Sequence, residues 1–207
     1  RPINVCSIPS KIMESIIKDA VMDHLICNEL INPSQHGFMP RRSCTTNLLA
    51  YLNEVTSALD SGVPFDAIMI DFRRAFDVVP FRRLLCKLES HGITGELLRW
   101  FADWTKMRQQ RVVINGQSSD WTDVISSVVQ GSVIGPILFL IYINDLDAVV
   151  NTESTKLFKF ADDSKFGRRI YDSNDSVGLQ ADLDRVGGSK WDGAPQPENH
   201  GSPFWLQ

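Results

Sequence analysis

The chain has 207 residues, of which 43% are hydrophobic and 22% charged, a composition typical of a globular protein that excludes wholesale disorder. Its formal net charge of −4 excludes a strongly basic nucleic-acid binder, although the first half of the chain is slightly basic and the second half acidic. No apolar run approaches the ~20 residues that cross a bilayer, so we expect no membrane partner.

Apolar residues with helical spacing predict helices in chain order over residues 10–26, 45–60, 80–92, 96–107, 133–144 and 177–186. Ser10 is expected to cap the first of them, and Pro80 to open the third. Between the first two helices lies a polar, glycine-containing loop over residues 35–43.

Three strand regions are interspersed with these helices. Residues 67–70 form a short continuous apolar run, which predicts a strand buried on both faces. Residues 111–114 and 123–129 are expected to pair as a hairpin, and residues 157–167 to form a second hairpin. Because strands and helices do not alternate regularly, we expect an α+β fold with helices covering one face of an antiparallel sheet.

Beyond residue 186 the sequence changes character. Residues 187–207 are dense in Gly and Pro and carry no apolar period, so we expect a tail that is disordered or loosely attached. The sequence starts at Arg1 rather than at Met, which predicts a piece of a longer protein.

Four cysteines lie far apart in the sequence and lack the spacing of a zinc site: Cys6, Cys27, Cys44 and Cys86. We expect them to be buried, reduced thiols. Reduced thiols are typical of an intracellular protein, in the nucleus or the cytoplasm.

Three carboxylates carry the candidate chemistry. Asp71 ends the apolar strand, and Asp162 and Asp163 are expected at the tip of the second hairpin. If this hairpin lies beside the first strand, all three acids meet at one sheet edge and could hold two divalent ions. Two simpler interpretations stay open: Asp-Asp is a frequent turn dipeptide, and Asp71 could pair with Arg73 or Arg74.

Five short segments add a pattern to these acids. They are Arg1-Pro2-Ile3, Gln35-His36-Gly37-Phe38, Asp71-Phe72-Arg73-Arg74-Ala75-Phe76-Asp77, Gln130-Gly131-Ser132-Val133-Ile134-Gly135-Pro136 and Phe160-Ala161-Asp162-Asp163. With these segments in this order, residues 1–186 resemble the reverse transcriptases of non-LTR (LINE-type, jockey-like) retrotransposons. The resemblance implies a right-hand polymerase with fingers and palm, an antiparallel palm sheet covered by helices, and a missing thumb.

The resemblance also implies site roles. Asp71 and Asp162 would ligate two Mg²⁺ or Mn²⁺ ions, with the backbone carbonyl of Phe72 as a further ligand and Asp163 as a less tightly bound partner. A primer 3′-hydroxyl would attack the α-phosphate of a deoxynucleoside triphosphate and release pyrophosphate. The implied activity is RNA-directed DNA polymerisation on an RNA template and a DNA primer.

Further residues would bind the nucleotide and the template. Phe76 matches the steric gate that excludes a ribose 2′-hydroxyl, although core packing would also explain it. Gln130 and Gly131 would lie against the nucleotide and template, and Arg1 would grip the triphosphate. Arg41 and Arg42 are candidate contacts to the template backbone.

The chain departs from the family pattern in two places. Val129 stands where the family commonly has proline, and the pattern fades at residue 186, so residues 187–207 are expected to be read out of frame. Because no thumb pattern follows, we expect weak or absent polymerisation by this chain alone. The alternatives are a non-catalytic nucleic-acid-binding remnant of a transposable element, or another metal-dependent phosphotransfer enzyme such as a nucleotide cyclase.

Overall fold

The computed structural model describes residues 6–106, 108–150 and 153–188. The chain divides into two compact units, each built from two separate stretches of sequence. Unit 1 comprises Arg1–Leu30 and Phe76–Tyr142, and unit 2 comprises Ile31–Ala75 and Ile143–Gln207. The expected tail falls almost entirely outside the described residues, since α7 ends at Gly187 and the description stops at residue 188.

Unit 1 contains four helices among its described residues: α1 (Ile8–Cys27), α3 (Phe81–Ser90), α4 (Gly95–Thr105) and α5 (Gly135–Ile143), the last of which runs to the unit boundary. The first helix begins before the predicted position, because Ser7 and not Ser10 accepts the capping hydrogen bond. Pro9 in the first turn has no N–H to leave unpaired, so it suits this early start.

A buried carboxylate ties unit 1 together. Glu14 on α1 is 1% exposed, and it accepts hydrogen bonds from the Trp104 indole (3.3 Å) and from the Val133 backbone N–H (2.8 Å). These contacts join α1 to α4 and to the segment before α5. Because a buried carboxylate is stable only when its oxygens are hydrogen-bonded, this arrangement fixes the entry to α5.

The predicted first hairpin has different partners in the structure. β3 (Val113–Ile114) pairs with β4 (Gln117–Ser118) around the Asn115-Gly116 turn, whereas β2 (Gln109–Gln110) pairs with β5 (Thr122–Asp123). Both turn residues have positive φ, as a two-residue hairpin turn with the native strand twist requires. The short turn therefore selects near neighbours, and the expected pairing of 111–114 with 123–129 is wrong.

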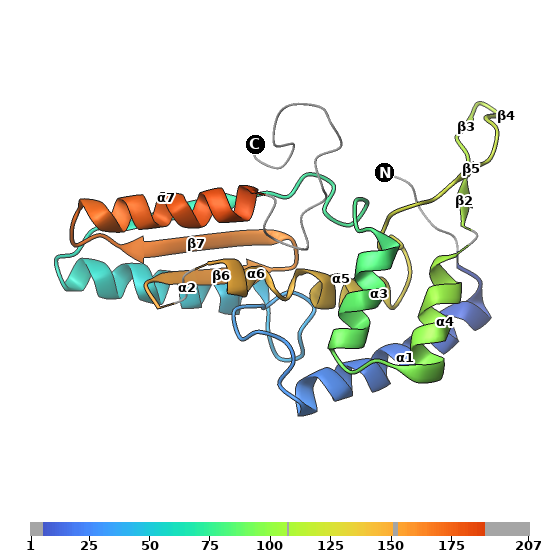
Figure 1. Cartoon of the computed structure of the whole chain (residues 1–207), viewed down its shortest axis with the longest axis horizontal. Helices are drawn as coiled ribbons and strands as arrows, with labels where there is room; N and C mark the ends of the chain where they lie inside the picture. Colours follow the sequence, from blue (N-terminus) through green and yellow to red (C-terminus); the bar gives the residue numbers. More distant parts are fainter. Residues whose placement is uncertain (1–5, 107, 151–152, 189–207) are drawn as a thin grey trace. The chain divides into compact units, whose positions relative to one another are not determined.

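Unit 2 is built on a three-stranded antiparallel sheet in the order β1-β7-β6, of which Figure 1 labels β6 and β7. The strands are β1 (Phe65–Ile70), β6 (Thr155–Phe160) and β7 (Asp163–Arg169), and the helices are α2 (Cys44–Asp60), α6 (Leu146–Val149) and α7 (Ser173–Gly187). The short helix α6 has no counterpart in the prediction. Ser43 and Asp172 each begin a helix with a reciprocal capping box, so α7 starts earlier than predicted.

Helices cover both faces of this sheet, not one as predicted. On one face, the Tyr51 ring of α2 contacts the rings of Phe65 and Phe158 edge-on. On the other face, the Thr155 hydroxyl donates to Asp182 of α7 at 2.6 Å. Figure 1 shows α2 and α7 on opposite sides of the strands. The sheet is thus the middle layer of unit 2.

Two expectations about burial are wrong. β1 is an edge strand, and Met69 is 68% exposed, because α2 covers only part of its face of the sheet. Cys27, Cys44 and Cys86 are exposed and Cys6 is partly exposed, although none forms a disulfide in the part that the structure describes. Among the described residues, no helix is long and apolar enough to cross a membrane.

Candidate active site

Two of the three predicted acids occupy facing positions at one end of the unit 2 sheet. Ile70, the last residue of β1, pairs with Ser164 of β7. Asp71 follows Ile70 and so faces Asp163, the first residue of β7. Asp163 lies on the face of β7 that carries Lys165, and Asp71 and Asp163 line one cavity together with Met69 and Lys165. The predicted meeting of Asp71 with the second hairpin is therefore observed.

The third acid lies in the turn itself. Ala161 and Asp162 form a two-residue connection between β6 and β7, with Phe160 paired to Asp163. Ala161 has φ of 57°, a left-handed conformation that is unfavourable for a residue with a side chain. Asp162 is half-buried and Asp163 is exposed. Backbone strain is thus concentrated immediately before the two acids.

A cavity of about 370 Å³ opens beside these acids. Its lining includes Asp71, Asp163, Asn47 and Lys165. The Lys165 ammonium lies 5.5 Å from the centre of the Tyr51 ring, within cation–π range. The sequence prediction missed Lys165, although its place two residues after Asp163 in a strand puts it on the same face.

The residues fit a divalent cation by donor chemistry, since carboxylate oxygens are the ligands that Mg²⁺ prefers. Asp71 makes no ion pair with Arg73 or Arg74 in the described chain, so the simpler interpretation of that acid is wrong. Within residues 6–106, 108–150 and 153–188, however, no three His, Cys, Asp or Glu side chains are gathered closely enough to form a ready cation site. An ion would have to draw the carboxylates together.

The predicted backbone ligand, Phe72, is a buried residue whose carbonyl accepts a hydrogen bond from the Ala75 N–H at 3.2 Å. The role of Phe72 stays a prediction.

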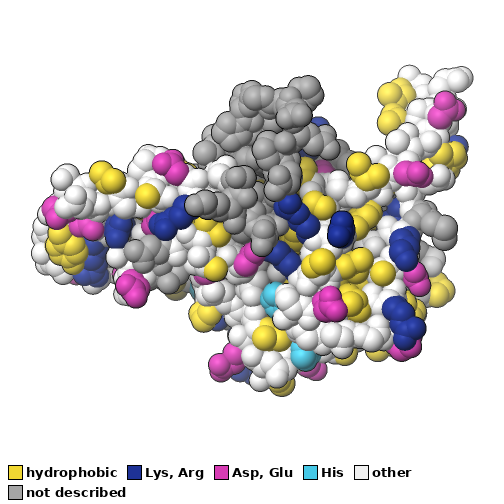
Figure 2. Space-filling model, in the orientation of Figure 1, with side chains coloured by type: hydrophobic (Ala, Val, Ile, Leu, Met, Phe, Trp, Pro, Cys, Tyr) yellow, Lys and Arg dark blue, Asp and Glu magenta, His cyan; other side chains and the backbone are white. Residues whose placement is uncertain are grey.

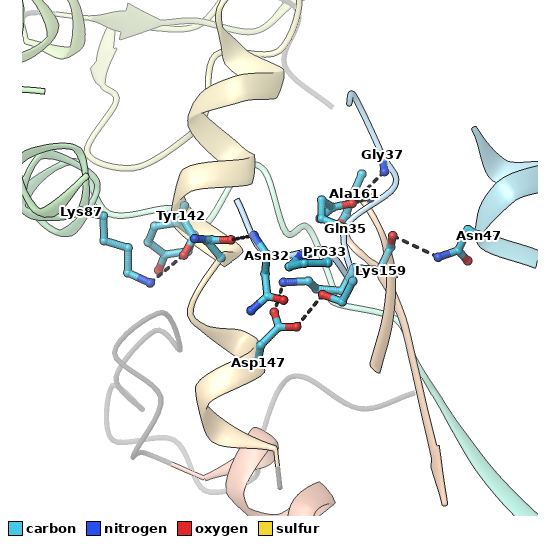
Figure 3. A network of polar contacts seen from close by, with 12 residues as sticks. Asn32, Pro33, Gln35, Gly37, Asn47, Lys87, Tyr142, Asp147, Lys159 and Ala161 are labelled. Atoms are coloured by element: carbon cyan, nitrogen blue, oxygen red, sulfur yellow. Dashed lines mark hydrogen bonds and ion pairs between the residues drawn. The ribbon is translucent and has the colours of Figure 1, made fainter. Parts of the chain in front are cut away.

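The loop over residues 32–37 lies along β6, on the side away from β7. The His36 N–H donates to the Lys159 carbonyl (2.8 Å), and the Lys159 N–H donates to the Ser34 carbonyl (2.9 Å). The Asn47 side chain also donates to the Lys159 carbonyl, at 3.2 Å. Figure 3 shows the bond between Asn47 and Lys159. The loop covers an edge of the sheet that would otherwise be open.

Beneath the loop lies a buried ion pair. Lys159 is 0% exposed and its ammonium contacts the carboxylate of Asp147, which is 7% exposed (Figure 3). Burial lowers the pKa of Lys159, and the Asp147 carboxylate opposes that shift. The Ser34 hydroxyl donates to the second Asp147 oxygen at 2.5 Å. The pair therefore joins β6, α6 and the loop.

Three further predicted site residues, Phe76, Gln130 and Gly131, lie in unit 1. The Phe76 carbonyl accepts a hydrogen bond from the Val128 N–H at 2.6 Å, which brings the Phe76 segment beside the segment leading to Gln130. The Phe76 ring stacks on Phe139 of α5 with centroids 4.1 Å apart. Packing therefore accounts for one side of the Phe76 ring, as the alternative interpretation expected.

The turn at Gln130 and Gly131 has two features that matter for binding. Gly131 has φ of 95°, which disfavours any residue with a side chain. The Gln130 side-chain oxygen is buried and has no hydrogen-bond partner within the described residues. An orphaned buried acceptor is uncommon in folded proteins.

The predicted arginines differ in their surroundings. Arg1 lies outside the described residues. Arg42 donates to the backbone carbonyls of Pro33 (2.6 Å) and Gln35 (2.5 Å), so it helps to hold the loop. Arg41 is exposed with φ of 61°. On the face seen in Figure 2, basic side chains of the described residues lie among acidic ones.

The structure thus assembles the predicted residues in two groups. Asp71, Phe72, Asp162 and Asp163 belong to unit 2, whereas Phe76, Gln130 and Gly131 belong to unit 1. The catalytic and binding roles assigned to them stay predictions.

Comparison with protein families gives a match over most of the chain. Residues 1–175 match the family described as reverse transcriptase (RNA-dependent DNA polymerase). Three Drosophila melanogaster proteins are similar: the probable RNA-directed DNA polymerases from transposon X-element (26% identity over 165 residues) and transposon BS (26% over 182), and the RNA-directed DNA polymerase from mobile element jockey (24% over 169). The matches cover 79%, 84% and 79% of this chain but only 18%, 19% and 18% of the relatives.

Two solved structures of telomerase from Candida tropicalis resemble the fold. One is apo telomerase truncated from the C-terminal domain, with a TM-score of 0.58, 13% identity, and coverage of 84% of this chain and 36% of that one. The other is telomerase in complex with a fragment of telomeric RNA, with a TM-score of 0.59, 12% identity, and coverage of 84% and 31%. At these identities the likeness concerns the fold alone.

Proposed function

This chain belongs to the reverse transcriptase (RNA-dependent DNA polymerase) family, and from that premise we propose that it is the fingers–palm part of an RNA-directed DNA polymerase of a non-LTR, jockey-like retrotransposon. The observation that carries the proposal is the facing position of Asp71 and Asp163 at one end of the unit 2 sheet. The reaction extends a primer 3′-hydroxyl with deoxynucleotides on an RNA template. Such a reaction belongs inside the cell, in the nucleus or the cytoplasm.

The acids would hold the cofactor. Asp71, Asp162 and Asp163, with the Phe72 carbonyl, would bind two Mg²⁺ or Mn²⁺ ions, which supply activation of the attacking hydroxyl and neutralisation of phosphate charge. Lys165 lines the same cavity and adds a positive charge beside it. A cation there favours an anionic substrate over a neutral one.

Nucleotide choice would depend on unit 1. Phe76 presents an aromatic ring whose position is fixed by its stack on Phe139, so it can exclude a ribose 2′-hydroxyl by steric repulsion. Gly131 lets the backbone approach the nucleotide closely, and the unpartnered Gln130 oxygen can accept a hydrogen bond. Arg1 would bind the triphosphate, and Arg41 and Arg42 the template backbone.

The chain spans about a fifth of the length of the relatives that it matches, so we expect weak synthesis by this chain alone. A fingers–palm part holds the primer–template duplex poorly because it contacts only part of the duplex.

A cation-binding measurement tests the proposal without requiring efficient synthesis. Titration of Mn²⁺ into the chain, followed by electron paramagnetic resonance, should show binding that Asp71→Asn and Asp163→Asn each weaken by about tenfold or more. The matched control is Asp184→Asn, because Asp184 is an exposed acid on α7. Equal Mn²⁺ affinity in the wild type and Asp71→Asn would contradict the proposal.

Primer extension is a second test of the proposed function. With a primed RNA template, deoxynucleotides and Mg²⁺, the wild type should add a few nucleotides and Asp71→Asn none. RNA binding that is equal in both proteins, with no incorporation and no cation binding by either, would support the non-catalytic remnant instead.

A further inference from the structure

One buried side chain contacts the acidic turn directly. Gln35 is 1% exposed, and it lies in the loop that runs beside β6. The backbone of this loop is fixed on both sides of Gln35 by the bonds that Ser34 and His36 make to Lys159. The side chain of Gln35 is therefore held in place before it reaches the turn.

The Gln35 amide binds both backbone groups of the first turn residue (Figure 3). Its oxygen accepts a hydrogen bond from the Ala161 N–H at 2.9 Å, and its nitrogen donates to the Ala161 carbonyl at 3.4 Å. The same oxygen accepts from the Gly37 N–H at 2.8 Å, which orients the amide. The side chain thus acts on the turn as a neighbouring strand would.

The contact requires a close approach of the two backbones. A Cβ atom on Gly37 would lie 2.2 Å from the Ala161 nitrogen, a distance that no side chain tolerates. The loop can therefore approach the turn only because residue 37 is glycine. This close fit restricts the position of the Ala161 peptide.

The turn needs such support. Ala161 has positive φ, a conformation that persists only where surrounding contacts determine it. A two-residue turn also has no strand beside its tip to bind its backbone groups. If the Ala161 peptide rotated, the directions of the next two side chains, Asp162 and Asp163, would change.

We propose that Gln35 is a positioning residue: by binding the Ala161 peptide, it fixes the directions in which Asp162 and Asp163 present their carboxylates to divalent ions. The inference rests on the proposed function in one respect, that these acids bind the ions. Gln35 would act through the turn, since the hydrogen bonds of its side chain go to the Ala161 backbone and the Gly37 N–H.

The first test measures the turn without any ion. Gln35→Met keeps the length of the side chain and removes its hydrogen-bonding groups. In hydrogen exchange followed by NMR, the Ala161 amide should exchange about tenfold faster than in the wild type, as expected for loss of a buried hydrogen bond. Gln35→Glu keeps an acceptor for the Ala161 and Gly37 N–H groups, so it should restore most of the protection.

The matched control is Ser34→Ala. Ser34 lies in the same loop, but its hydroxyl binds Asp147 and not the turn. This variant should lower global stability while leaving the Ala161 exchange rate, measured under native conditions, close to that of the wild type. Unchanged Ala161 exchange in Gln35→Met, or equal acceleration in Ser34→Ala, would overturn the inference.

The second test connects the turn to the ions, with Mn²⁺ alone as the probe. Gln35→Met should weaken Mn²⁺ binding by about tenfold, the lower end for loss of an outer-shell partner, and Ser34→Ala should not. Wild-type binding that depends on Asp71 but is equal in Gln35→Met would overturn the inference and leave the proposed function standing. Absence of Asp71-dependent binding in the wild type would overturn the proposed cation site itself.

Discussion

Lys159 and Asp147 form an ion pair that is almost completely shielded from water, and Lys159 lies one residue before the strand end that leads into the acidic turn. Their charges are compensated by each other and by the Ser34 hydroxyl, which donates to Asp147. A buried pair of this kind is sensitive to the loss of either partner, because the remaining charge stays buried without compensation.

Removal of one charge should therefore destabilise the protein strongly. We expect Lys159→Met to lower the free energy of unfolding by about 3–5 kcal/mol, and Asp147→Leu by a similar amount. The double variant should be more stable than either single variant, since no unpaired charge is left. Urea unfolding monitored by circular dichroism measures all four proteins, and additive effects would contradict the assigned coupling.

The close contact between Gly37 and the Ala161 peptide predicts a second stability effect. Gly37→Ala should lower the free energy of unfolding by about 1–3 kcal/mol, because the new methyl group overlaps the Ala161 nitrogen. Gly62→Ala is the control in the same unit: the site is open and only its positive φ is unfavourable. A smaller loss of unfolding free energy in Gly37→Ala than in Gly62→Ala would show that the loop moves away from the turn easily.

Stability should also depend on pH through His36. Burial, and secondarily the charge of Arg42, lower the pKa of His36 below its ordinary 6.5. The unfolded chain therefore binds a proton more readily than the native protein does. The contribution of neutral His36 to stability is fully present above pH 6.5, and it is lost as the pH falls through the lowered pKa.

Urea unfolding at several pH values between 7.5 and 5 checks this expectation. The wild type should lose stability as the solution is acidified, and His36→Gln should lose less. Identical pH dependence in the two proteins would assign the effect to other groups.

The stack of Phe76 on Phe139 predicts an effect on sugar discrimination under the proposed function. Phe76→Ala should reduce the preference for deoxynucleotides over ribonucleotides by about tenfold or more, since the excluded volume is lost. Phe139→Ala should reduce it less, by releasing the Phe76 ring. Single-nucleotide incorporation measures this preference as the ratio of the deoxynucleotide rate to the ribonucleotide rate.

Phe101→Leu is the control for this measurement, because Phe101 is a fully buried residue of α4. It should change stability and leave the ratio unaltered. An unchanged ratio in Phe76→Ala would remove Phe76 from the nucleotide site.

Much of the local structure follows from the sequence, because helices and tight turns depend on residues near one another in the chain. The apolar spacing predicts the helices over 45–60 and 96–107 to within about two residues of α2 and α4. The apolar run that precedes Asp71 predicts a strand, and the acidic pair predicts a hairpin. The tip expected at Asp162 and Asp163 is wrong by one residue, because the turn is formed by Ala161 and Asp162 and Asp163 begins β7. Where local signals were ambiguous, as at Ser7 and Ser10, the prediction chose the wrong cap.

Contacts between distant residues were decided by the tertiary structure alone. The sequence suggests that Asp71 could meet the hairpin, but only the register of β1 with β7 brings it opposite Asp163. The bonds between Gln35 and Ala161 join residues 126 positions apart, and no local pattern marks them. The second helical layer depends in the same way on which helices pack against the finished sheet, and the strand order β1-β7-β6 makes β1 a partly exposed edge strand. Apolar spacing gives the local conformation of a segment, whereas its neighbours are selected by the combined burial and hydrogen bonding of the whole unit.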